Sequence, residues 1–65
     1  MSNERLVTLI WDEEIVTGPK QGEKTTVRHP GCFMVLAEVA CMKQNLSTTN
    51  SKGEPIVASN FRIEQ

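Results

Sequence analysis

The run Cys32–Met42 constrains the fold more than any other segment of this chain. Ten of its eleven residues are apolar, and Glu38 is the exception. A chain of 65 residues has room for one core, because a domain of this size buries only roughly 60% of the surface of its unfolded chain. We therefore predict a single small domain over residues 1–65, with this run, including Val35, at the centre of its core.

The apolar run fits either a helix or a strand by periodicity alone. Its length exceeds that of most strands, and its Met, Leu, Ala and Glu residues, with Lys43 and Gln44 after them, favour a helix. We predict a helix near residues 31–44, with Pro30 in its first turn and Asn45 in the left-handed position after its end. Helical spacing would then place five residues on one inward stripe: Phe33, Leu36, Ala37, Ala40 and Cys41.

The first strand is predicted at residues 5–11, which are rich in β-branched and aromatic residues. Alternation places Val7, Leu9 and Trp11 on one face and leaves a second, largely apolar face opposite. A strand that is apolar on both faces needs a cover on each side. In so small a chain one cover is expected to be a second copy, so we predict a homodimer.

The remaining elements follow from turn residues and short β-rich runs. We expect a turn at residues 12–14, a short strand at 15–17, a loop at 18–23, and a strand at 24–28 that ends at His29-Pro30-Gly31. Residues 47–54 are polar and turn-rich, and residues 55–64 form the last strand, with Val57, Phe61 and Ile63 toward the core. The predicted fold class is α+β, a small antiparallel sheet of about four strands with one helix near 31–44. If the run were a strand, a small SH3-like five-stranded barrel would result.

Charge and composition bear on two classes of partner, nucleic acids and membranes, and favour neither. The chain carries 7 basic and 8 acidic residues, without the basic excess that is typical of nucleic-acid-binding domains. No segment has the roughly 18 apolar residues of a membrane span, and no signal-peptide pattern is recognised. We therefore expect a cytoplasmic protein with no membrane partner.

The residues capable of metal or catalytic chemistry are few. His29 and Cys32 form one close pair and Cys41 stands alone, whereas a structural zinc site needs four ligands. No phosphate-binding glycine loop or nucleophile with a positioned base is present in the sequence. We predict no metal, no cofactor and no enzymatic activity. The two cysteines are expected to be buried, reduced thiols without a disulfide.

A protein-interaction or regulatory module (an adaptor, inhibitor or antitoxin-like protein) is the function that remains. The predicted binding surface is the outward side of residues 24–28 and the preceding loop, with Lys20, Lys24, Thr26 and Arg28 as its residues. Arg28 is the strongest candidate, since its planar guanidinium can bind a carboxylate through two hydrogen bonds.

A small nucleic-acid-binding domain is the alternative function. Sheets of this size bind single strands by stacking bases on aromatic side chains that are flanked by Lys and Arg. The residues available for this are Trp11, Phe61, Lys24, Arg28 and Arg62.

Overall fold

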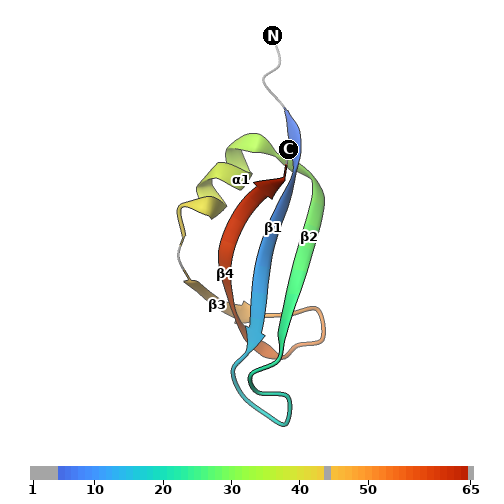
Figure 1. Ribbon diagram of the computed structural model, residues 1–65, viewed down its shortest axis with the longest axis vertical. Coiled ribbons are helices and arrows are strands. Elements are labelled where there is room, and N and C mark those ends of the chain that lie inside the picture. The colour runs from blue at the N-terminus through green and yellow to red at the C-terminus, as the bar shows by residue number, and fades with distance from the viewer. Residues whose placement is uncertain (1–4, 44, 65) are drawn as a thin grey trace.

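The computed structural model describes residues 5–43 and 45–64. Its elements follow the order β1 (Leu6–Ile15), β2 (Lys24–Phe33), α1 (Met34–Cys41), β3 (Asn45–Thr49) and β4 (Pro55–Glu64). The four strands form one antiparallel sheet in the order β2-β1-β4-β3, with α1 packed against one face near one end (Figure 1). The predicted α+β class with about four strands and one helix is confirmed, and the barrel alternative is wrong.

The face of the sheet that contacts α1, here called the inner face, carries the core. Val7, Leu9, Cys32 and Ala37 are buried together, and five half-buried side chains surround them: Trp11, Met34, Ala40, Phe61 and Ile63. The predicted grouping of Val7, Leu9 and Trp11 on one face is therefore confirmed. On the opposite face of β1, Ile10 is buried but Leu6 is exposed, so that apolar face is only partly covered.

The strand β1 continues through residues 12–14, where the sequence predicted a turn. Asp12, Glu13 and Glu14 are all paired with residues of β2 and of β4. Because the neighbouring strands offer Thr and Lys side chains opposite these acids, their charges are accommodated within the sheet. The predicted short strand at 15–17 is consequently reduced to Ile15, the last residue of β1.

The strand β2 also continues past the predicted break at His29-Pro30-Gly31. Val7 pairs with Cys32 and Leu9 pairs with His29, so Pro30 and Gly31 together oppose the single residue Thr8. This is a β-bulge, and Gly31 takes a positive φ of 72° within it. A proline is tolerated here because β2 is an edge strand.

A second bulge changes which side of β4 faces the core. Ile10 pairs with Arg62 but Asp12 pairs with Ser59, which leaves one extra residue on β4 at Asn60, whose φ is 57°. The alternation of side chains is inverted beyond this point. Ile56 and Ala58 are therefore buried, whereas Val57, predicted in the core, lies opposite Glu14 on the outer face.

The helix is shorter than predicted. Of the predicted inward stripe, Ala37 and Ala40 do pack on the core, whereas Phe33, Leu36 and Cys41 are exposed. Met34 N–H donates to the carbonyl of Arg5 at 2.8 Å, and Pro30 lies in β2 instead of the first helical turn. Asn45 begins β3, within a region where the sequence predicted no strand before residue 55. Val35 is 64% exposed, so its predicted place in the core is wrong.

Both cysteines, Cys32 and Cys41, are free thiols in the structure. Cys32 is buried, as expected, but Cys41 is exposed. In the part of the chain that the structure describes, no helix is long and apolar enough to cross a membrane.

Candidate protein-binding surface

The outward side of α1 is the most unusual surface of the described chain. Ala37 is fully buried against the sheet, and helical geometry of 100° per residue puts Val35, Val39 and Met42 on the opposite side. These three residues, spaced by four and then three positions, form a stripe that faces solvent. We call it, together with the neighbouring Leu36, the α1 stripe.

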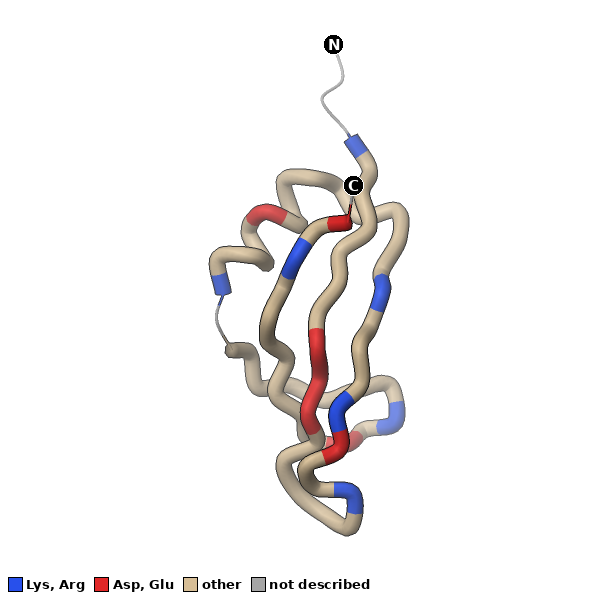
Figure 2. Tube along the Cα trace, in the orientation of Figure 1, with Lys and Arg blue, Asp and Glu red and all other residues tan. Residues whose placement is uncertain are grey.

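The side chains of the α1 stripe are well exposed. Met42 is 82% exposed, Leu36 59% and Val39 51%. A surface helix normally places polar residues on the side away from the core, and a helix that is apolar all round is normally buried. Glu38 is the one charged residue of α1, which is otherwise uncharged (Figure 2). Helical geometry places it beside the stripe. The outer side of α1 therefore departs from the polar composition of an ordinary surface helix.

Three more exposed apolar side chains lie beyond the two ends of the helix. Phe33 directly precedes α1 and pairs with Leu6 of β1, and both are exposed. Leu46 lies four residues after Met42 and pairs with Ala58, so it faces the same side of the sheet as α1. By alternation from the core pair Val7 and Cys32, Leu6 and Phe33 point to the outer face of the sheet, away from α1. The apolar surface of the stripe thus continues only at the C-terminal end of the helix, toward Leu46.

The predicted binding residues are divided between the two sides of the sheet. Lys24, Thr26 and Arg28 share the outer face of β2, opposite Glu14, Asp12 and Ile10 respectively. Lys20 instead lines a shallow hollow of about 230 Å³ on the inner side, between the β1–β2 loop and the β3–β4 loop. The structure therefore brings three of the four predicted residues together and separates the fourth from them.

Arg28 and Thr26 already have partners within the chain. The Arg28 guanidinium forms a two-bond ion pair with the carboxylate of Glu64, across the intervening strand β1. The pair crosses β1 beside Ile10, which is buried although it lies on the outer face. The hydrogen bonds from Arg28 lower the pKa of Glu64, and the same contact raises the pKa of Arg28. An external carboxylate would have to displace Glu64.

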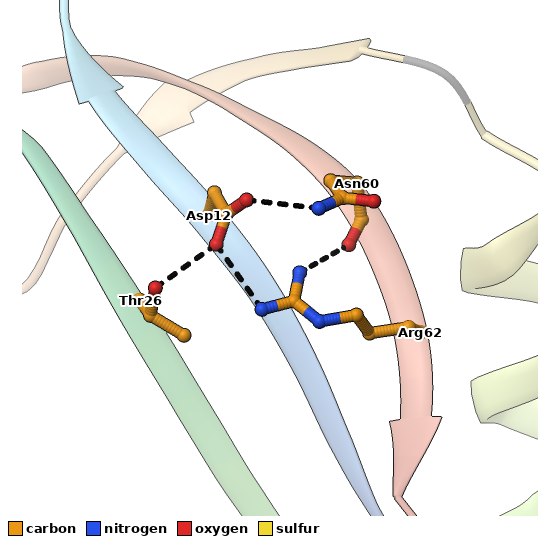
Figure 3. A network of polar contacts seen from close by, with 4 residues as sticks. All are labelled: Asp12, Thr26, Asn60 and Arg62. Atoms are coloured by element: carbon orange, nitrogen blue, oxygen red, sulfur yellow. Dashed lines mark hydrogen bonds and ion pairs between the residues drawn. The ribbon is translucent and has the colours of Figure 1, made fainter.

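A second polar network on the outer face is centred on Asp12 (Figure 3). Asn60 Nδ2 and Thr26 Oγ1 each donate to the Asp12 carboxylate at 3.0 Å, and Arg62 Nη2 lies 3.4 Å from it. The hydrogen bonds from Asn60, then Thr26, hold the pKa of Asp12 below its usual value. Because Asn60 is the bulge residue of β4, this network stabilises the bulge and ties β2, β1 and β4 together.

The aromatic residues proposed for base stacking lie on the inner side of the sheet. Trp11 and Phe61 are half-buried, with their ring centroids 5.9 Å apart, and His29 approaches Trp11 at 6.4 Å. The Trp11 indole N–H donates to Glu13 at 2.9 Å. On the outer face, basic Lys24, Arg28 and Arg62 alternate with acidic neighbours. The nucleic-acid alternative thus gains no support from these positions.

The potential metal ligands are not grouped. Within residues 5–43 and 45–64, no three His, Cys, Asp or Glu side chains lie close enough to hold a metal ion. His29 pairs with Leu9 in the β1–β2 ladder, Cys32 is part of the core, and Cys41 is at the end of α1.

The α1 stripe was missed by sequence reasoning, although a signal for it exists. With Ala37 and Ala40 as the inward residues, the larger side chains Val35, Val39 and Met42 are left on the other side of the helix. Here the small residues Ala37 and Ala40 face the sheet and allow a close approach of the helix.

No family model, curated protein or solved structure matches this chain.

Proposed function

We propose that this protein is a small non-enzymatic protein-binding module, an adaptor, inhibitor or antitoxin-like regulator that self-associates and acts by docking on protein. The observation that carries this proposal is the exposed α1 stripe. A helix with apolar side chains on its outward side gains stability only when another surface removes them from water, at about 25 cal/mol per Å² of apolar area.

The remaining surfaces support binding better than catalysis. The outer-face polar groups Arg28, Glu64 and Asp12 are engaged in contacts with one another or with neighbouring strands. The hollow near Lys20 is shallow and lined by loop residues of both charges, including Glu23 and Lys52. We place the protein in the cytoplasm, because two free thiols suit a reducing compartment.

A capture experiment with matched variants tests the proposal. The tagged full chain is incubated with nuclease-treated lysate, as wild type and with Val39→Glu or Gln21→Glu. Both changes introduce one negative charge, but Gln21 lies in the β1–β2 loop, at the opposite end of the molecule from α1 (Figure 1). We expect a nuclease-resistant protein complex that Val39→Glu abolishes and Gln21→Glu retains.

Two results would count against a protein-binding role for α1. A complex that nuclease releases, or one that weakens by orders of magnitude between low and moderate salt, would favour nucleic acid. A protein complex that Val39→Glu leaves unchanged would place the binding surface elsewhere, with Lys24 and Arg28 as the next residues to test by reversal to Glu.

A further inference from the structure

We propose that the α1 stripe is a two-fold interface on which α1 of a second copy of this chain packs in antiparallel orientation, with Val39 next to the axis. This inference rests on the proposed function and specifies the partner of that surface. It is argued from the extent of the apolar surface, from its lack of charge, and from the position of its midpoint.

The extent of the exposed apolar surface is suited to a dimer. Five exposed apolar side chains lie on α1 and at its C-terminal end: Val35, Leu36, Val39, Met42 and Leu46. Together they present on the order of 400 Å² of apolar area, within the range of the largest patches of ordinary monomers, roughly 300–600 Å². Here that area belongs to a chain of 65 residues. A standard interface covers about 800 Å² per partner, so this patch with a polar rim would suffice.

The composition of the stripe favours a permanent partner over an occasional one. Its four residues are uncharged, as in the interfaces of obligate homodimers, which resemble a divided core. The buried core of a single copy is thin, with Ile56 as the largest fully buried side chain among the described residues. A second copy is the one partner present whenever the chain itself is present, so it alone keeps the stripe covered at all times.

The spacing of the stripe is self-complementary under a two-fold axis. Its ends are Val35 and Met42, so its midpoint falls between Glu38 and Val39. When a second helix runs antiparallel across this point, Val35 of each copy faces Met42 of the other. Val39 of each copy meets its counterpart near the axis. Apolar residues therefore face apolar residues along the stripe.

Glu38 gives this arrangement a specific signature. The two-fold axis runs between the two helices and perpendicular to both. It therefore places the same flank of both helices on the same side of the interface, and the two Glu38 carboxylates lie near each other at its rim. Like charges at helical neighbour distances are mildly unfavourable, so Glu38→Gln is expected to tighten the dimer roughly twofold. With a different, basic protein on the stripe, the same substitution would weaken binding.

Disulfide trapping tests the interface without placing a charge in it. Axes of packed helices lie roughly 8–10 Å apart and Cα atoms lie about 2.3 Å from each helix axis, which brings facing Cα atoms near the two-fold axis to about 3.4–5.4 Å. This overlaps the range for a disulfide. Val39→Cys in a Cys41→Ser background should therefore form a covalent dimer on mild oxidation, whereas Gln21→Cys in the same background should not.

Sedimentation equilibrium of the purified wild-type chain completes the test. We expect a species of twice 7.3 kDa at micromolar concentration, and faster cross-linking at position 39 than at position 21. A 7.3 kDa species throughout, or equal cross-linking at the two positions, would overturn the two-fold interface. If the chain is monomeric but a lysate protein is still lost with Val39→Glu, this inference fails while the proposed function stands.

Discussion

The bulge at Asn60 determines which residues of β4 belong to the core, and a pair of adjacent threonine substitutions tests it. Plain alternation from Phe61 and Ile63 would bury Val57, whereas the observed register buries Ile56, which is 1% exposed between Ile15 of β1 and Thr48 of β3. Ile56→Thr and Val57→Thr introduce the same residue at neighbouring positions of one strand. Thr is well suited to a strand whose side chain meets solvent, so any difference reports burial.

The expected magnitudes follow from what each position contacts. Ile56→Thr loses about 0.8 kcal/mol for the methylene that is removed. It also places a hydroxyl in an apolar site, which costs about 1–3 kcal/mol when no partner is available. The free energy of unfolding should therefore fall by roughly 2–4 kcal/mol, a large part of the total for a domain of this size. Val57→Thr keeps the shape of the side chain on the outer face and should stay within about 0.5 kcal/mol.

Urea unfolding followed by the fluorescence of the one tryptophan, Trp11, measures both variants. All samples are compared at one protein concentration, because self-association makes apparent stability concentration-dependent. Equal slopes with different midpoints would confirm that stability alone has changed. If Val57→Thr destabilises the protein as much as Ile56→Thr or more, the register of β4 deduced from the bulge is wrong.

Three other predictions concern the bulge, the helix and the outer face. Asn60→Val should lower the free energy of unfolding by more than about 1 kcal/mol, because a β-branched residue disfavours a φ near 57°. Asn60→Gly, which accepts this φ and loses only the hydrogen bond to Asp12, should lower it less. Equal unfolding midpoints for the two variants would contradict a left-handed residue at this position. Ala37→Leu should destabilise the fold by about 1–3 kcal/mol, because the larger side chain overpacks the contact between α1 and the sheet. Val39→Leu, on the outward side, should leave the stability unchanged, and thermal melting measures both variants. An Ala37→Leu variant that melts like the wild type would mean that α1 does not lie close to the sheet. Asp12 and Glu64 have lowered pKa values in the folded chain, so the unfolded chain binds protons more readily. The stability that these carboxylates contribute should be present above about pH 4.5 and decline as the pH falls below it. Urea midpoints measured over a pH series check this, and Asp12→Asn should flatten the decline.

The candidate site was accessible to sequence reasoning only in part. The outward placement of Lys24, Thr26 and Arg28 on one strand face follows from alternation, and the structure has it so. That Arg28 is bound to Glu64 does not follow, because the two residues are 36 positions apart in sequence. The orientation of α1 was accessible in part: Ala37 and Ala40 face the sheet as the helical stripe predicted, but Leu36 and Cys41 are exposed. Periodicity alone does not decide between the apolar sides of such a helix.

The sequence by itself determined the types of the main elements and much of their pattern. The β-branched run from Leu6 produces a strand with two apolar faces, the long run of helix-favouring residues after Phe33 produces a helix, and residues 55–64 produce a strand. These are local properties, set by side-chain shape and by alternation over a few residues, so they survive any arrangement of the rest.

Only the tertiary structure decided where each element continues and which side it buries. The acids at 12–14 remain in β1 because β2 and β4 pair with them on both sides. Pro30 and Gly31 remain in β2 because they form a bulge opposite Thr8. A one-residue bulge at Asn60 inverts the faces of β4, and the closeness of the helix to the sheet selects Ala37 over Val35 as the inward residue. Each of these outcomes depends on contacts between segments that are distant in sequence, and local composition does not determine such contacts.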